Sequence, residues 1–262
     1  MKSILLIVIL ALSASSALSE PEEPPLAGLE DLAPRSRAET RDFLSADELM
    51  ANALSHFPSK PLTISGHLLV RRKRGIPVLK RDFEIAVHWG ADPIVARYTI
   101  REESGADLEQ LTVTRKSGQT PEFKYAAGTL LAPTNVPDML TSIQASDMCW
   151  LDLTLSFLWW KGGAIKGSEK VRGFDCYIVD IPAPEGRTNQ YSRVRLWIEK
   201  KINVMLQAEG YDAKDKLLRR LWVRSCKKID DTWMIKDLEV QRYPVRHRTK
   251  LHISEVRVNT KL

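Results

Sequence analysis

Short apolar runs with a period of two fill most of the chain after residue 61 and restrict its fold more than any other feature. Successive side chains of a strand point to opposite faces of a sheet, so this period indicates strands with one buried face. The runs lie at residues 62–70, 83–89, 94–101, 108–116, 177–181, 194–198, 204–208, 221–223, 234–240 and 251–253. Links of hairpin length, rich in Gly, Pro and Asp, predict antiparallel pairing. We therefore expect a mainly β fold with one antiparallel sheet of about 10–11 strands, curled or closed because flat sheets of that size curl or split.

Two segments depart from this period and are expected to be helical. Apolar residues recur at helical spacing over 43–57, where Ser45 can cap the helix with Glu48 three residues later. Residues 148–160 contain one charged residue, Asp152, and place several leucines on one helical face. An N-terminal helix and a short inserted helix are thus available to cover one face of the sheet.

The N-terminal 37 residues have a different character from the rest. Lys2, an apolar run over 4–12 and small residues at positions 17 and 19 are typical of a cleavable secretory signal, so 1–19 is expected to be removed. An uncleaved anchor is the alternative, although the run is shorter than the roughly 20 residues that span a bilayer. Residues 20–37 are acidic and rich in Pro, which predicts a flexible tether. Residues 38–262 then form one domain.

Motifs for catalysis and for metal binding are missing from the sequence. It contains no nucleophile elbow, no zinc-protease helix motif and no phosphate or dinucleotide loop. His247 and His252 are five residues apart and would point to opposite faces of a strand. We therefore expect no catalytic residue, no metal and no cofactor, and regard a hydrolase with an unrecognised site as the weakest alternative.

Charge and cysteine content add two open points. The net charge is +6, and its densest basic cluster, 71–74, lies at a predicted hairpin turn. In an exported chain this cluster is more simply solvated turn charge, so nucleic acid is not an expected partner, whereas peripheral contact with an acidic membrane surface stays open. Cys149, Cys176 and Cys226 lack metal-site spacing, and one disulfide of unknown connectivity is compatible with export.

Three stretches of the second half resemble the outer-membrane lipoprotein-sorting protein family, which has the LolA/LolB-like periplasmic carrier fold. They read GFDCYIV at 173–179, YSRVRLWIEK at 191–200 and MLQAEGYDAKDK at 205–216. The segment CWLDL at 149–153, with Phe157 and Leu158, also resembles the part that these proteins place before the glycine. The likeness covers about 150–260 well, and 40–125 only in the order of a helix followed by strands. The chain departs from the family in its tether and in its long loop at 126–147, and no arginine that would hold a lid closed can be placed.

The resemblance implies an unclosed half β-barrel, with the two helices as a lid over a hydrophobic cavity for acyl chains. It implies a periplasmic protein that carries or sorts lipids or acylated lipoproteins towards the outer membrane without bond chemistry. An inner- or outer-membrane protein would be a further partner. The alternative is an envelope sensing or scaffold domain that binds a protein on the concave sheet, and a dry, fully packed core is the alternative to a cavity. The residues expected to line the cavity and lid are Leu49, Met50, Trp150, Phe157, Trp159, Val179, Leu196, Ile198, Val204 and Leu206.

Overall fold

The computed structural model describes residues 45–71, 77–186, 190–229, 232–245 and 247–258. The expected signal at 1–19, the expected tether at 20–37 and most of the basic cluster at 71–74 lie outside the described residues. Those expectations stay predictions, as does the assignment of 38–262 to one domain.

Thirteen strands and two short α-helices make up most of the described chain. In chain order the elements are α1 (Ala46–Ser55), β1 (Leu62–Arg71), β2 (Pro77–Val87), β3 (Ile94–Arg101), β4 (Asp107–Arg115), β5 (Glu122–Ala127), β6 (Ala132–Thr134), the 3₁₀ helix η2 (Ile143–Ala145), α2 (Trp150–Thr154), the 3₁₀ helix η3 (Ser156–Trp159), β7 (Ala164–Val171), β8 (Phe174–Pro182), β9 (Arg193–Glu199), β10 (Met205–Tyr211), β11 (Leu217–Ile229), β12 (Thr232–Arg242) and β13 (Arg248–Val258). No helix of the described segments has the length and apolar character needed to cross a bilayer.

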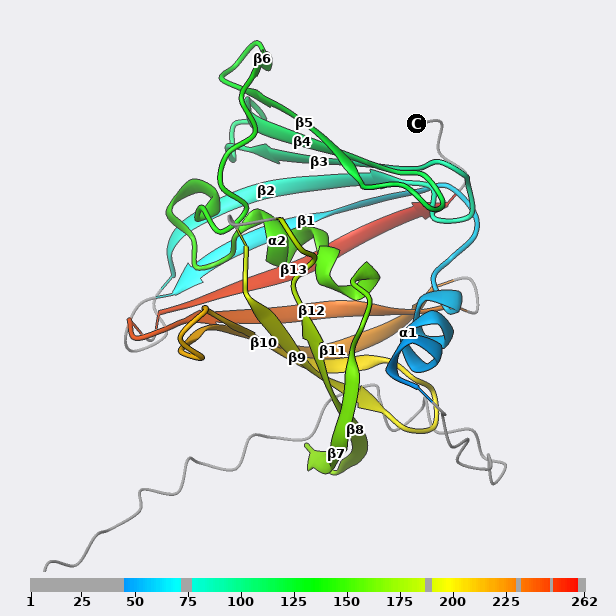
Figure 1. The fold of residues 1–262 in the computed structure, drawn as a ribbon. Coiled ribbons are helices and arrows are strands. Elements are labelled where there is room, and N and C mark those ends of the chain that lie inside the picture. The colour runs from blue at the N-terminus through cyan, green and yellow to red at the C-terminus, as the bar shows by residue number, and fades with distance from the viewer. Residues whose placement is uncertain (1–44, 72–76, 187–189, 230–231, 246, 259–262) are drawn as a thin grey trace, which may run out of the picture.

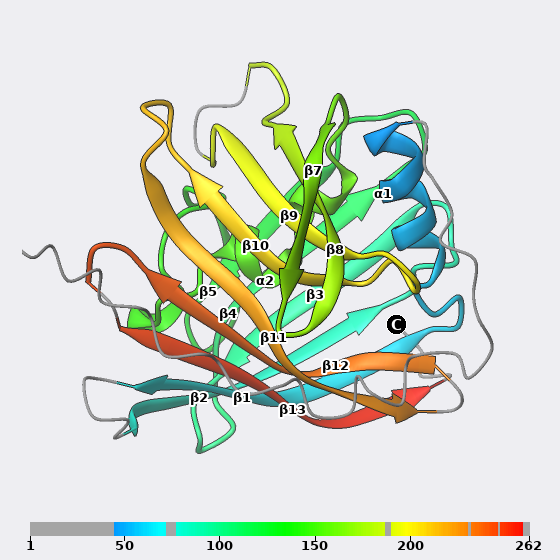
Figure 2. The same ribbon diagram turned by 90° about the horizontal axis from the view of Figure 1, so that it is seen from below.

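All thirteen strands belong to one sheet, and the order across it is β6-β5-β4-β3-β2-β1-β13-β12-β11-β10-β9-β8-β7. Every neighbouring pair is antiparallel. Each half of the sheet is therefore a simple meander, and the pairing of β1 with β13 joins the two halves in the middle (Figure 1). The sheet curls strongly around the helices without closing (Figure 2). The predicted fold class, a mainly β, unclosed half-barrel covered by helices, is confirmed.

The sheet contains more strands than the 10–11 expected, because β5, β6 and β7 lie where the alternation is weak. β6 has only three residues and includes Pro133. β7 forms one end of the sheet and six of its eight side chains are exposed, so its sequence shows no apolar face. A strand that buries neither face needs no alternation of apolar and polar residues, so its sequence does not reveal it.

The concave face of the sheet carries the hydrophobic core, and the helices pack against it. Leu68 of β1, Ile100 of β3 and Val223 of β11 are at most 1% exposed. The predicted N-cap of α1 is formed as expected, since the Glu48 N–H donates to the Ser45 Oγ at 3.1 Å. α1 contacts η3, so the two covers meet over the sheet.

The inserted segment is not one continuous helix. α2 ends at Thr154; the next residue, Leu155, has a left-handed φ of 47°, and the chain continues as η3. This break turns Ser156 back towards Thr154, whose hydroxyl lies 2.7 Å from the Ser156 hydroxyl.

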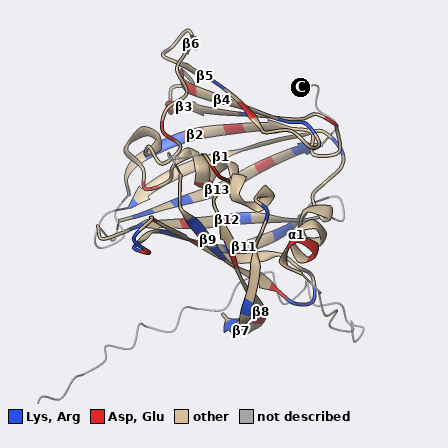
Figure 3. Ribbon diagram, in the orientation of Figure 1, with Lys and Arg blue, Asp and Glu red and all other residues tan. Residues whose placement is uncertain are grey.

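Acidic and basic residues are interspersed along the strands of the sheet (Figure 3). Arg195 of β9 donates two hydrogen bonds to Asp180 of β8, at 2.6 and 2.8 Å. His252 of β13 is about one-third exposed and pairs with Asp237 at 2.7 Å. The three cysteines are free and buried, so no disulfide joins them.

Candidate functional site

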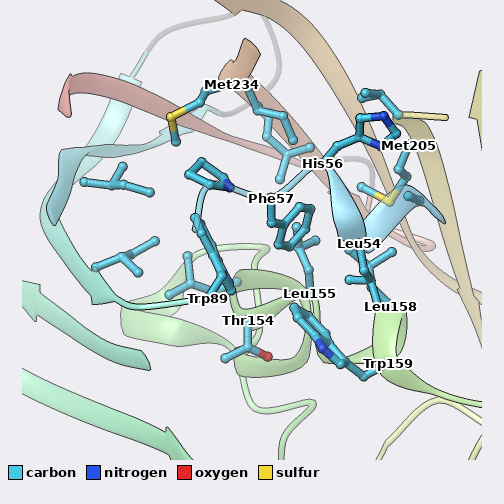
Figure 4. A pocket seen from close by; sticks show the side chains of 18 of the residues that line it. Leu54, His56, Phe57, Trp89, Thr154, Leu155, Leu158, Trp159, Met205 and Met234 are labelled. Carbon is cyan, nitrogen blue, oxygen red and sulfur yellow. The ribbon is translucent and has the colours of Figure 1, made fainter. Parts of the chain in front are cut away.

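A cavity of about 200 Å³ lies between the concave face of the sheet and its helical cover. The cover contributes the end of α1 with the residues after it, and the junction of α2 and η3. The sheet contributes inward-facing residues of β1, β2, β3 and β9 to β13. Figure 4 shows the large apolar side chains that line the cover side: Leu54, Phe57, Leu155, Leu158 and Trp159.

Four of the ten residues predicted for the cavity line it, namely Met50, Trp159, Ile198 and Val204. The other six belong to the packed core around it, where each is at most 1% exposed: Leu49, Trp150, Phe157, Val179, Leu196 and Leu206. Alternation identifies the face to which a side chain belongs, but not whether the cover contacts it. Among the predicted strand residues, Ile198 and Val204 border the cavity, whereas Val179, Leu196 and Leu206 are enclosed in the packed core.

Three aromatic side chains, contributed by separate segments, close one side of the cavity. Phe57 follows α1 and makes edge-on contacts with Trp89, at 5.0 Å between ring centres, and with Trp159, at 5.8 Å. Phe57 and Trp89 were absent from the predicted site. The signal that could have identified them is their position, since each follows the end of an element where the chain turns over the concave face.

A fully buried polar cluster lies beneath the cavity and fixes the start of α2. Asp152 is 0% exposed and accepts a 2.5 Å hydrogen bond from the Tyr191 hydroxyl. Its second oxygen accepts from the backbone N–H of Cys149 at 3.2 Å and from its thiol at 3.0 Å. Arg219 Nε of β11 lies 3.6 Å from the same oxygen. We call Cys149, Asp152, Tyr191 and Arg219 the Asp152 cluster.

Burial dominates the protonation of the Asp152 cluster. It raises the pKa of Asp152, against the opposing effects of Arg219 and of the hydrogen bonds from Tyr191 and Cys149. Burial, followed by the charge of Asp152, also raises the pKa of the Cys149 thiol and of the Tyr191 phenol. Both groups therefore stay protonated and act as hydrogen-bond donors, so the cysteine is not an activated nucleophile.

A second set of contacts ties the loop before α2 to the sheet. Arg219 donates to the backbone carbonyls of Asp147 and Leu140, each at 2.9 Å. The hydroxyl of Thr249 on β13 donates to the Asp147 carboxylate at 2.9 Å and accepts from the Asp147 N–H at 2.8 Å. The α2 end of the cover is therefore anchored by buried polar bonds, which are costly to break.

The η3 end of the cover is held by Arg115, at the end of β4. Its guanidinium donates to the Ser156 hydroxyl at 2.7 Å and lies over the Trp159 ring, 4.4 Å from the ring centre. The sequence analysis could not place an arginine that holds the lid. Arg115 was not recognisable because its partners lie more than 40 residues away on the inserted segment.

The wall of the cavity is largely apolar. Cys226 contributes a thiol to its wall, and burial raises the pKa of that thiol to about 12. The Asp152 carboxylate at its floor is already occupied by its partners. Within the described ranges, no three His, Cys, Asp or Glu side chains are close enough to hold a metal ion. The cavity has room for an apolar group.

The sequence was compared with protein families and with curated proteins. A family profile that carries the description "Uncharacterized protein" matches residues 134–262. No curated protein matches the sequence.

Three solved structures share the architecture over most of their length. A DUF1329 family protein from Desulfovibrio piger is 22% identical with a TM-score of 0.70, covering 82% of this chain and 92% of its own. A domain from Vibrio parahaemolyticus, named as an outer membrane lipoprotein-sorting protein domain, is 15% identical with a TM-score of 0.69, covering 83% and 92%. A LolA superfamily protein from Nitrosomonas europaea is 11% identical with a TM-score of 0.66, covering 84% and 96%. The resemblance seen in the sequence is confirmed at the level of the fold: this chain has the half-barrel architecture of the LolA superfamily and of lipoprotein-sorting domains.

Proposed function

We propose that this protein binds acyl chains of lipids or lipoproteins in the cavity under its helical cover, and carries or sorts them in the periplasm towards the outer membrane. The observation that carries the proposal is the apolar cavity itself, which lies between a curled sheet and a two-part cover. Two proteins with the same architecture are named for lipoprotein sorting or for the LolA superfamily, which supports the assignment.

The energetics favour an acyl chain as the ligand. Each methylene moved from water into an apolar site contributes ~0.8 kcal/mol, so six buried methylenes give ~5 kcal/mol. The aromatic and aliphatic wall supplies that environment, and no described wall residue supplies an activated nucleophile. The proposal therefore involves binding and release without a cofactor or a chemical step. Periplasmic location rests on the predicted signal at 1–19, and delivery to a membrane protein partner is part of the same proposal.

Release requires a cover that can move, and the two ends of the cover are held differently. The α2 end is anchored by the buried Asp152 cluster, whereas at the η3 end Arg115 donates to Ser156 and lies over the Trp159 ring, which also contacts Phe57. We propose that opening occurs at η3 while α2 stays in place.

Binding can be tested by filling the cavity from α1. Ala53 lines the cavity, whereas Ala51 is exposed on the same helix. Ala53→Phe places a ring in the space that an acyl chain would occupy, and should weaken binding of a fluorescent fatty-acyl probe by at least about ten-fold, ~1.4 kcal/mol. The dissociation constant is measured by probe fluorescence.

Ala51→Phe is the matched control, because it makes the same substitution on the same helix outside the cavity. It should bind the probe like wild type. Unchanged binding by Ala53→Phe would place the probe elsewhere. A wild-type protein that binds no acyl probe, and carries no lipid when purified from an envelope fraction and weighed by native mass spectrometry, would support the scaffold alternative.

A further inference from the structure

Two histidines face each other across the central seam of the sheet, on the side opposite the cavity. His67 of β1 and His252 of β13 are direct partners in the antiparallel register. Side chains of such a pair lie on the same face of the sheet, with their Cβ atoms about 4.5–5.5 Å apart. The next pair along the seam, Leu68 and Leu251, is buried in the core. Because successive side chains alternate between faces, the two imidazoles lie on the outer face.

Each imidazole is held by a carboxylate on the strand beyond it. His67 Nδ1 lies 2.7 Å from an Asp82 carboxylate oxygen, and Asp82 is the partner of His67 on β2. His252 Nδ1 lies 2.7 Å from an Asp237 carboxylate oxygen, and Asp237 is the partner of His252 on β12. The four residues form one row across four adjacent strands, in the order Asp82, His67, His252 and Asp237. We call it the histidine row.

These contacts leave the other nitrogen of each ring available. A carboxylate only accepts hydrogen bonds, so Nδ1 carries the hydrogen and Nε2 of the neutral ring carries a lone pair. Neither Nε2 has a hydrogen-bond partner among the described residues, and neither is a buried atom; the two side chains are 33% and 32% exposed. Nδ1 points towards β2 in one ring and towards β12 in the other. The far side of each ring, which carries Nε2, is therefore turned towards the seam between them.

We infer that His67 and His252 bind one divalent transition-metal ion through their Nε2 atoms, with water completing its coordination. Metal–nitrogen bonds of about 2.0–2.1 Å require the two Nε2 atoms to lie about 3–3.5 Å apart, which the separation of facing Cβ atoms permits. Zn²⁺ and Cu²⁺ suit imidazole ligands, whereas Mg²⁺ requires oxygen ligands. Asp82 and Asp237 stand where carboxylates commonly orient metal-ligating histidines and raise their basicity.

The charges around the histidine row are balanced before a metal binds. Lys250 Nζ lies 2.7 Å from Asp237 and Lys80 Nζ lies 4.0 Å from Asp82, so each carboxylate of the row has one lysine beside it. A dication at the two Nε2 atoms therefore meets no uncompensated positive charge. The site has two protein ligands, which agrees with the lack of any three-residue metal group in the described part of the chain.

A metal ion in this position would join the first strand to the last. The pairing of β1 with β13 is the contact that connects the two halves of the sheet. An ion that binds only the folded protein stabilises it, so this ion would strengthen the seam from outside. The inference goes beyond the proposed function and does not depend on it. It also revises the expectation that no metal binds, which considered His252 with His247 and not with His67.

The experiment is a calorimetric titration of the protein, without a histidine tag, with Zn²⁺ in a buffer that does not bind metal. Wild type should bind one ion per chain, and Mg²⁺ should give no binding heat. His67→Gln and His252→Gln should each weaken Zn²⁺ binding at least about ten-fold, since a single imidazole remains. The double variant should differ little from either single variant, because the two side chains act as one site.

His88→Gln is the matched control, because it makes the same substitution just after β2, outside the histidine row. It should bind Zn²⁺ like wild type. A second readout uses wild type alone, so it does not depend on the folding of any variant. On addition of Zn²⁺, the imidazole NMR resonances of His67 and His252 should shift together, whereas those of His88 should stay in place.

Three results would overturn the inference: no Zn²⁺ binding by wild type, unchanged binding by both His67→Gln and His252→Gln, or resonance shifts confined to other histidines. None of them affects binding of an acyl probe, which would use the opposite face of the sheet. Loss of acyl binding would in turn leave the metal site standing.

Discussion

Gly210 shows how one missing side chain allows the buried centre of the molecule to form. A Cβ at this position would lie 2.4 Å from two carbons of the Tyr191 ring, far inside contact distance. Because Gly210 leaves that space, the ring packs against β10 and its hydroxyl reaches Asp152. The Asp152 cluster, and with it the position of α2, therefore depends on a glycine that contributes no atom to it.

Gly210→Ala should destabilise the protein by about 2–3 kcal/mol, because the ring of Tyr191 must move and the hydrogen bond to Asp152 is lost. The free energy of unfolding in urea measures the effect. In a Tyr191→Ala background the same change should cost less than about 1 kcal/mol, since no ring remains to displace. Equal costs in both backgrounds would mean that the strain comes from the β10 backbone.

At the same scale, the sequence predicted only some of the residues that line the cavity. Met50, Trp159, Ile198 and Val204 were chosen for their apolar character and their pattern, and they border the cavity. Asn203 could not be recognised, because an Asn in a hairpin loop is explained by its backbone preference alone. Only the three-dimensional structure shows that this residue is buried and borders the cavity.

At the scale of elements, three neighbouring strands hold a charged cluster on the outer face. Asp237 of β12 contacts Ser225 of β11, and Lys250 and His252 of β13 at 2.7 Å each. Burial would raise the pKa of Asp237, but hydrogen bonds from Lys250, Ser225 and His252 outweigh it and lower the pKa from 3.8 to about 2. The cluster bridges β11, β12 and β13 next to the central seam of the sheet.

This cluster predicts a specific loss of stability in acid. The lowered pKa means that folded Asp237 holds its charge where the unfolded chain is already protonated, so its stabilisation is complete above pH 3.8 and is lost as pH falls towards about 2. The loss should reach up to about 2 kcal/mol in unfolding free energy. Lys250→Met removes one donor and moves the folded pKa of Asp237 back towards 3.8, so the loss should be smaller and complete at higher pH, whereas Asp237→Asn should abolish this component. Identical pH profiles for all three proteins would contradict the assignment.

The elements were predictable where one face is buried and the other is not. β1 to β4 and β8 to β13 follow the alternation and were identified from it. β7 was missed because its side chains are mostly exposed, and β6 because it is short and contains Pro133. The break at Leu155 was also not predictable, because leucine has no preference for a left-handed backbone.

At the scale of the whole molecule, Arg115 connects the β1–β6 half of the sheet to the cover, while the Asp152 cluster connects the other half to it. Arg115→Met should lose the bond to Ser156 and the contact with Trp159, together worth about 1–2 kcal/mol of local stability. Hydrogen exchange should therefore speed up in residues 155–160 and stay unchanged in β11. Arg97→Met, at an exposed position on neighbouring β3, is the control. Faster exchange throughout the protein would indicate global destabilisation instead of local opening.

The unclosed sheet has two edge strands, β6 and β7, and the unpaired backbone N–H and C=O groups along their free edges could pair with another chain. β6 limits this by its length of three residues and by a proline that has no N–H to donate. β7 is longer, but Lys166 and Lys170 are exposed on it and a register irregularity between Ile165 and Gly167 interrupts its edge. Incomplete closure thus does not commit the molecule to self-association. A half-barrel whose two edge strands resist pairing in this way can stay open without taking up a strand from another chain.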